Sequence, residues 1–158
     1  MSCKSVLREG DFAPDFELPA HDGSMVKLSD FKGRIIVLYF YPRAMTSGCT
    51  REAKRFNELI EEFERFGAIV FGVSNDPVDK IKRFAEKLGL KFKLLSDEGN
   101  KVIEKYGVVR RRGDKISANR VTFIISPDGR IVKVLKNIRP AEKHADLALE
   151  EVRKIAQG

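Results

Sequence analysis

The chain has 158 residues, of which 42% are hydrophobic and 34% are charged, and its formal net charge is +7. A chain of this length buries enough apolar surface to fold without disulfides or a structural metal, so we expect a single domain over residues 1–158. No apolar run reaches the roughly eighteen residues of a membrane span, and the N-terminus lacks a signal-peptide block. These features predict a cytoplasmic protein with no membrane partner.

The cysteines, histidines and basic residues exclude several classes of protein. Two cysteines, Cys3 and Cys49, rule out a disulfide-rich secreted scaffold and allow at most one intramolecular bridge. His21 and His144 are far apart and no cysteine pair has ligand spacing, so we expect no metal and no cofactor. Basic residues are interleaved with Asp and Glu except at residues 110–112, which favours a solvated ionic surface over nucleic-acid binding.

The first half of the chain alternates between strand and helix patterns. Residues 35–41 form a continuous apolar run rich in β-formers, typical of a strand buried on both faces. After a loop, one predicted helix has apolar side chains at helical spacing, namely Phe56, Leu59, Ile60, Phe63 and Phe66. Gly67 is expected to end that helix, and residues 68–74 are predicted to form a second strand.

The middle of the chain repeats this alternation. Asp76 and Pro77 are typical of a helix start, with Asp as the N-cap and Pro at the first helical position. The helix should end at Gly89, and its predicted buried stripe is Ile81, Phe84, Ala85 and Leu88. Residues 92–95 are expected to form a short strand, and residues 100–106 a short helix.

The last third of the chain predicts a hairpin and a closing helix. Extended runs over residues 121–126 and 130–136 are joined by Pro-Asp-Gly, which is turn chemistry, so they should pair antiparallel. A last helix is expected from about Ala141. Strand-helix-strand units that lead into a hairpin and a helix predict an α/β, thioredoxin-like fold: a central mixed sheet flanked by helices, with an N-terminal extension.

The loop after the first strand carries the strongest chemical signal. It lacks the GxGxxG and GxxxxGKS/T patterns, so nucleotide binding is disfavoured. Cys49 lies just beyond the strand's carboxyl end, where sites gather in α/β sheets. A helix N-terminus and the cations Arg43 and Arg51 favour its thiolate form, and Gly48 lets backbone approach the sulfur. The alternatives are a cysteine that only packs at a helix start and, for Thr46, a plain capping role.

Several segments resemble one known family. Residues 41–52, YPRAMTSGCTRE, resemble the peroxiredoxin active-site pattern PxxxTxxC in the form of the bacterioferritin-comigratory or Q-type subfamily. Further segments that resemble this family are residues 10–18, 72–74, 94–97 and 120–125. The resemblance extends from about residue 10 to residue 131. It implies a peroxidase of the EC 1.11.1 class that reduces hydrogen peroxide and organic hydroperoxides at the expense of a thiol.

The resemblance also implies roles for individual residues. Cys49 would attack the peroxide as a thiolate and become a sulfenic acid. Pro42 would shield the pocket, Thr46 would hydrogen-bond the peroxide, and Arg120 would hold the thiolate and polarise the O–O bond. Donors fixed in advance stabilise the charge that moves to the leaving oxygen. Glu52 is expected to orient Arg120 or a neighbouring arginine, or else to act only as a first-turn acid favoured by the helix dipole.

The chain departs from this subfamily in how the sulfenic acid is reduced. Many members carry a resolving cysteine five residues after the first, where this chain has Lys54. We favour a one-cysteine cycle in which a thioredoxin-like protein or a small thiol reduces Cys49. The alternative is that Cys3 resolves the sulfenate, in its own chain or in a partner's. The expected protein is a monomer or a homodimer.

Two other functional classes remain open at this point. A thioredoxin-type disulfide oxidoreductase needs CxxC, and Thr46 stands where its second cysteine would be. A non-catalytic binding or holdase protein on the same fold is the second alternative. The joint presence of Pro42, Thr46, Cys49 and Arg120 disfavours it.

Overall fold

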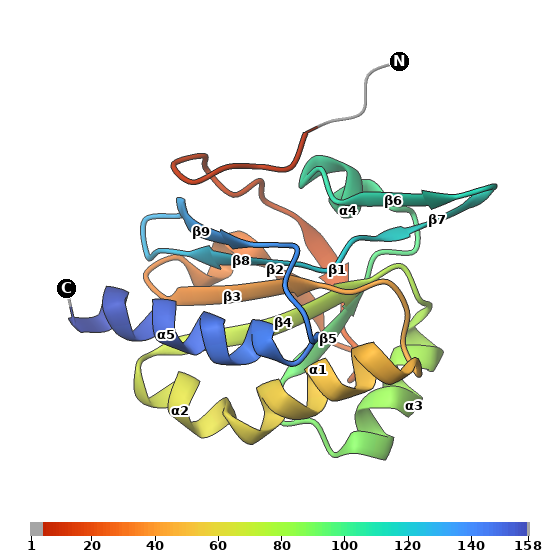
Figure 1. Ribbon diagram of the computed structural model, residues 1–158, viewed down its shortest axis with the longest axis horizontal. Coiled ribbons are helices and arrows are strands. Elements are labelled where there is room, and N and C mark those ends of the chain that lie inside the picture. Colours follow the sequence, from red (N-terminus) through yellow and green to blue (C-terminus); the bar gives the residue numbers. More distant parts are fainter. Residues whose placement is uncertain (1–4, 158) are drawn as a thin grey trace.

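The computed structural model describes residues 5–157, and its centre is a five-stranded mixed sheet in the order β5-β4-β3-β8-β9 (Figure 1). The strands are β3 (Ile35–Phe40), β4 (Ala68–Ser74), β5 (Lys93–Ser96), β8 (Val121–Ile125) and β9 (Ile131–Leu135). β4 runs parallel to both β3 and β5, whereas β8 runs antiparallel to β3 and β9. The predicted central strand and the predicted hairpin are both confirmed. Every residue of β3 is buried, as its continuous apolar run predicts.

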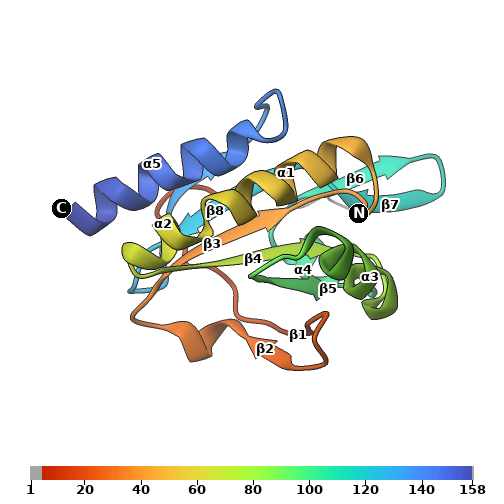
Figure 2. The ribbon, with the colours of Figure 1, turned by 90° about the horizontal axis from the view of Figure 1, so that it is seen from below.

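Helices cover the sheet on both faces. They are α1 (Ser47–Glu58), α2 (Ile60–Arg65), α3 (Val78–Leu88), α4 (Lys101–Lys105) and α5 (Lys143–Gln157). Side chains of α1, α2, α3 and α5 form one buried cluster with the sheet, and those of α4 belong to a second cluster on the other face. Figure 2 shows α1 and α5 on one side of the sheet and the N-terminal strands on the other. No helix within residues 5–157 is long and apolar enough to cross a membrane.

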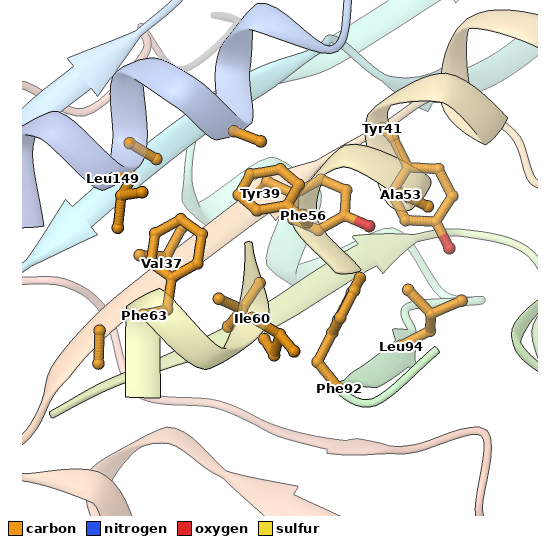
Figure 3. Packing of buried hydrophobic residues seen from close by; sticks show 14 of the residues in the cluster. Val37, Tyr39, Tyr41, Ala53, Phe56, Ile60, Phe63, Phe92, Leu94 and Leu149 are labelled. Atoms are coloured by element: carbon orange, nitrogen blue, oxygen red, sulfur yellow. The ribbon is translucent and has the colours of Figure 1, made fainter. Parts of the chain in front are cut away.

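Aromatic packing fixes α1 over the central strand. Tyr39 of β3 and Phe56 of α1 stack with their ring centroids 4.3 Å apart, and both side chains are buried (Figure 3). Phe92 packs edge-on against Tyr39, with a centroid distance of 6.0 Å. Burying such rings is among the largest stabilising contributions that single side chains make. The packing sets where the N-terminus of α1 lies relative to the end of β3.

The structure corrects two predicted helix boundaries. The single helix predicted up to Gly67 is two helices, because Leu59 (φ −97°, ψ 3°) leaves helical geometry between α1 and α2. This bend lets α1 pack beside α5 while α2 packs against β4. Asp76 is not an N-cap: Pro77 (φ −68°, ψ 160°) takes that position and α3 begins at Val78. The carboxylate of Asp76 instead accepts a hydrogen bond from the Ala44 N–H, in the loop between β3 and α1.

Smaller differences lie at element ends, and two hairpins were not predicted. β5 begins at Lys93 and α5 at Lys143, one or two residues later than expected. The unpredicted elements are β1 (Glu17–Pro19), β2 (Met25–Lys27), a 3-10 helix (Leu28–Phe31), β6 (Val109–Arg112) and β7 (Lys115–Ala118). β1 and β2 form one antiparallel hairpin, and β6 and β7 form the other. Strands of three or four residues are too short to show a clear alternation of apolar and polar side chains.

Gly72 provides a test of the packing between neighbouring strands. A Cβ atom there would lie 2.7 Å from Tyr39 Cζ and 2.9 Å from Leu94 Cδ2, and both of these side chains are buried. We therefore expect Gly72→Ala to lower the free energy of unfolding by about 1–3 kcal/mol, because the extra methyl group overpacks the core. Urea unfolding followed by circular dichroism measures the change.

Gly99→Ala is the matched control. A Cβ atom at Gly99 has Lys101 Cγ, at 3.9 Å, as its nearest neighbour, so the unfolding free energy should change by less than about 0.5 kcal/mol. Equal losses in the two variants would contradict the packing described here.

Candidate active site

Cys49 occupies the first turn of α1, just after the carboxyl end of β3. α1 begins at Ser47, and the cysteine side chain is buried with 1% of its surface exposed. The first N–H groups of a helix have no partner within the helix, and they carry the positive end of its dipole. The placement predicted for Cys49, at a strand end and a helix start, is what the structure shows.

The antiparallel pairing of β3 with β8 brings Arg120 to the cysteine. Phe40, the last residue of β3, pairs with Val121, the first residue of β8. Arg120 therefore lies at the same edge of the sheet as Cys49, although the two residues are 71 positions apart. One guanidinium nitrogen of Arg120, Nη2, lies 3.4 Å from Cys49 Sγ. The structure thus brings together Cys49 and Arg120, the two residues that the resemblance to the family pairs.

Glu52 holds the other side of the same guanidinium. It follows Cys49 by three residues on α1, so both side chains face the same way. Arg120 Nη1 donates a hydrogen bond of 2.6 Å to Glu52 Oε1, and the Glu52 side chain is fully buried. Burial raises the pKa of Glu52 to about 8, although the charge and hydrogen bond of Arg120 lower it. Of the two roles considered for Glu52, contact with Arg120 is the one that the geometry favours.

A histidine and a threonine that sequence reasoning missed extend this cluster. His144 of α5 is fully buried, and its Nδ1 lies 2.9 Å from Thr122 Oγ1 and 3.9 Å from Glu52 Oε2. Burial, with a smaller effect of the Arg120 charge, lowers the pKa of His144 to about 4, so its imidazole is neutral at pH 7. The sequence does indicate that His144 is buried, because it lies four residues before Ala148 and thus on the buried face of the predicted last helix.

The hydroxyl of Thr46 is not used to cap the helix. Thr46 occupies the N-cap position of α1, but its side chain makes no capping hydrogen bond. Its Oγ1 donates instead to the carbonyl of Arg43, at 2.9 Å, within the same loop. A hydroxyl that donates one hydrogen bond retains two acceptor lone pairs. The Thr46 side chain therefore does not cap α1, so the alternative of a plain capping role is wrong.

Asp76 ties the active-site loop to the sheet. Its Oδ2 accepts hydrogen bonds from the Ala44 N–H at 2.7 Å and from the Ser74 hydroxyl at 2.8 Å. Lys80 lies 3.1 Å from its other carboxylate oxygen, Oδ1. Because Ala44 lies between Pro42 and Thr46, these contacts fix the loop on which both side chains stand. No local sequence pattern predicts this contact, because it joins positions 32 residues apart.

A hollow of about 430 Å³ opens in front of this cluster. Four predicted site residues line it, namely Pro42, Thr46, Gly48 and Arg120. Gly48 lies so close to Arg120 that a Cβ atom there would be 3.2 Å from Nη2. Cys3 lies outside the described residues, so its place relative to the hollow is not part of the structure. Within residues 5–157 no group of three His, Cys, Asp or Glu side chains is placed to hold a metal ion.

Comparisons with known proteins identify the family of the chain. Residues 10–134 match the family model described as the AhpC/TSA family. The chain is 41% identical over 144 residues to peroxiredoxin Bcp of Escherichia coli strain K12, across 87% of this chain and 91% of that protein. It is 38% identical over 156 residues to peroxiredoxin Bcp of Bacillus subtilis, across 96% of this chain and 99% of that protein.

Solved structures give the same result. Peroxidoxin BcpB of Mycobacterium tuberculosis superimposes with a TM-score of 0.88 at 39% identity, covering 94% of this chain and 98% of that one. A cysteine-to-serine variant of PrxQ from Xylella fastidiosa gives a TM-score of 0.89 at 30% identity, covering 96% and 98%. The predicted thioredoxin-like fold is confirmed. The chain belongs to the AhpC/TSA family and, within it, to the peroxiredoxins represented by Bcp and peroxiredoxin Q.

Proposed function

We propose that Cys49 is the nucleophile of this thiol-dependent peroxidase and that Arg120 and Thr46 complete its reaction centre. The observation that carries the proposal is the 3.4 Å contact between Arg120 Nη2 and Cys49 Sγ at the start of α1. In the reaction, the thiolate sulfur forms a bond to one peroxide oxygen and the O–O bond breaks. The sulfur is oxidised to a sulfenic acid, and the leaving oxygen takes up a proton to become water or an alcohol.

Arg120 and Thr46 would act on the charge that moves in this step. Negative charge passes from the sulfur to the leaving oxygen, and the Arg120 guanidinium faces both the sulfur and the hollow where the peroxide would sit. The Thr46 oxygen lines the same hollow and has acceptor capacity for a peroxide O–H. Donors and acceptors that are already in place stabilise the transition state without reorganisation.

Hydrogen peroxide and alkyl hydroperoxides are the proposed substrates. A solved structure of the Xanthomonas campestris bacterioferritin comigratory protein is described as giving insight into its alkyl peroxide reduction activity. That protein is 30% identical to this chain, with a TM-score of 0.86, covering 97% of this chain and 99% of that one. The shared fold and family support the same substrate class here.

The proposed cycle uses one cysteine of this chain and an external thiol. Position 54, where a resolving cysteine would stand, is an exposed lysine. An external thiol would attack the Cys49 sulfenic acid, release water and form a mixed disulfide, and a second thiol would free Cys49. The reductant is then oxidised to a disulfide in the amount that matches the peroxide reduced.

His144 lies next to Glu52 and is neutral at pH 7, so it does not change the net charge of the site. Arg120 faces two acidic groups, Cys49 and Glu52, while the His144 imidazole adds no charge at neutral pH. The buried imidazole takes up a proton only near pH 4, whereas an unfolded histidine does so near pH 6.5. Protonation therefore favours the unfolded chain at acid pH.

The roles of Cys49 and Thr46 give the first kinetic test. Cys49→Ser should abolish peroxide consumption, because a serine hydroxyl is not ionised near neutral pH. Thr46→Val should lower kcat/KM by roughly 10²-fold, since it removes one fixed polar partner of the peroxide. Thr50→Val is the control, because the Thr50 hydroxyl only bonds the Thr46 carbonyl, and its loss should be less than about threefold. Normal turnover by Cys49→Ser would exclude the mechanism.

His144 predicts how stability depends on pH. The pKa of His144 is lower in the folded protein than in the unfolded chain. The contribution of His144 to the free energy of unfolding is therefore complete above about pH 6.5. It is lost as the pH falls toward 4, by up to about 1.4 kcal/mol per pH unit. The unfolding free energy of the wild type minus that of His144→Asn should therefore decrease from pH 6.5 to 4.5, as measured by urea denaturation. A difference that stays constant would show that His144 is not buried as a neutral group. His21→Asn, at a half-buried position, should show a smaller change.

The reductive half of the cycle is tested with Cys3→Ser. After one equivalent of peroxide, intact-mass analysis should find one added oxygen on Cys49 in both the wild type and Cys3→Ser, with no crosslink on a non-reducing gel. A disulfide that forms in the wild type and disappears in Cys3→Ser would show instead that Cys3 is the resolving cysteine.

A further inference from the structure

The entrance to the active site is surrounded by basic side chains. The hollow next to Cys49 is lined by the loop after β3, by Gly48 of α1, by Arg120 and by the β6–β7 hairpin. This hairpin projects at the end of the molecule where the loop after β3 lies (Figures 1 and 2). Besides Arg120, four cationic residues line it: Arg43, Arg110, Arg112 and Lys115. A second hollow of about 540 Å³ shares Arg110 and Arg120 and adds Lys136 and Arg139. Neither hollow is lined by an aspartate or a glutamate.

These cations are not neutralised by nearby acids. Arg120 pairs with Glu52, but no described carboxylate within residues 5–157 forms an ion pair with the other cations of the two hollows, namely Arg43, Arg110, Arg112, Lys115, Lys136 and Arg139. Elsewhere on the surface the pattern differs: Arg51 and Arg55, on α1, each reach an acidic residue near α5. A concave surface lined by one sign of charge concentrates ions of the opposite sign.

The size and lining of the first hollow restrict what binds there. Its 430 Å³ suit a small molecule. Pro42 is its only lining residue with a wholly apolar side chain of more than two carbons, and the others are cationic, hydroxylated or glycine. A long hydrocarbon chain has no apolar surface to cover in such a hollow. The expected ligand is small, polar and negatively charged.

We propose that this hollow binds the reductant, and that the reductant is a small thiol bearing carboxylate or phosphate groups; the inference rests on the peroxidase function proposed above. Hydrogen peroxide carries no charge, so the cations give it no added attraction. A thiol attacks as its thiolate, which the same cations stabilise. The chain also has lysine at position 54, where a resolving cysteine would stand, and in the one-cysteine cycle proposed above the oxidised Cys49 depends on a thiol from outside.

The proposed step is the first half of the reductive cycle. The anionic thiolate forms a bond to the Cys49 sulfur, the sulfenic oxygen leaves as water after taking up protons, and a mixed disulfide results. Cys49 lies in the first turn of α1, at the end of the helix whose N–H groups have no acceptor within the helix. The carboxylate or phosphate groups would meanwhile contact the hairpin cations Arg110, Arg112 and Lys115.

The test isolates the reductive step from the peroxide step. Protein pre-oxidised with one equivalent of hydrogen peroxide, with the added oxygen on Cys49 verified by mass, is mixed with mercaptosuccinate or with the uncharged 1-thioglycerol. Mixed-disulfide formation is followed by quenched-flow mass spectrometry, and rates are expressed per thiolate. Mercaptosuccinate should react at least roughly tenfold faster at low salt. This advantage should shrink at about 1 M salt, where the Debye length is only about 3 Å.

Two triple variants with the same net charge test which cations cause the preference for the anionic thiol. Replacing Arg110, Arg112 and Lys115 by Gln together should bring the ratio of the two rates close to one. The control replaces Lys82, Arg83 and Lys87 by Gln; these exposed cations of α3 line neither hollow, and the ratio should stay as in the wild type. Both triple variants remove three positive charges, and circular dichroism checks that both are folded.

The possible results separate two kinds of failure. If peroxide leaves Cys49 with neither an added oxygen nor a disulfide, the proposed function itself fails. If peroxide instead yields a disulfide between Cys3 and Cys49, the external reductant proposed here is wrong and the peroxidase proposal stands. If Cys49 is oxidised but both thiols react at equal rates, or if the two triple variants lose the preference equally, the proposed anionic reductant is wrong and the peroxidase proposal stands.

Discussion

Arg120 is held between two acidic groups, the Cys49 thiol and the Glu52 carboxyl, and the rest of the site depends on that arrangement. A guanidinium keeps its charge in any protein environment and presents several donors in a fixed plane, so one side chain contacts both acids. The hydrogen bond to the Glu52 carboxyl restricts the orientation of the Arg120 guanidinium. The sulfur therefore faces a cation whose position is set before any peroxide arrives.

The aromatic core and the polar site are two parts of one structure. Stacking of Tyr39 on Phe56 fixes α1 over β3, which places Cys49 at the sheet edge, and the pairing of β3 with β8 places Arg120 opposite. Asp76 adds a third restraint, since it holds the loop that carries Pro42 and Thr46. Burial supplies most of the stability of such a fold, and hydrogen bonds then select one arrangement of the polar groups.

Much of the fold follows from local sequence patterns, and most of the site does not. The apolar run of β3, the Pro-Asp-Gly turn and the amphipathic helices were visible in the sequence, as was Cys49 at a strand end. The contacts of Asp76 and His144 were not, because they join residues distant in sequence and depend on how helices pack. In the sequence the basic run at residues 110–112 is only an exception to the interleaving of charges. That Arg110 and Arg112 line the hollow of the site follows from the fold.

The register between β3 and β8 is itself a determinant of catalysis. In the observed pairing Phe40 faces Val121, and Arg120 follows directly at the end of the ladder. A shift of one residue would turn the Arg120 side chain to the opposite face of the sheet and move it along the strand by about 3.3 Å. Insertions in the Pro-Asp-Gly turn at the far end of β8 leave this alignment intact. The length of the segment that precedes β8 is therefore constrained by the need to place Arg120 at Cys49. The length of the turn that follows β8 is constrained only by folding.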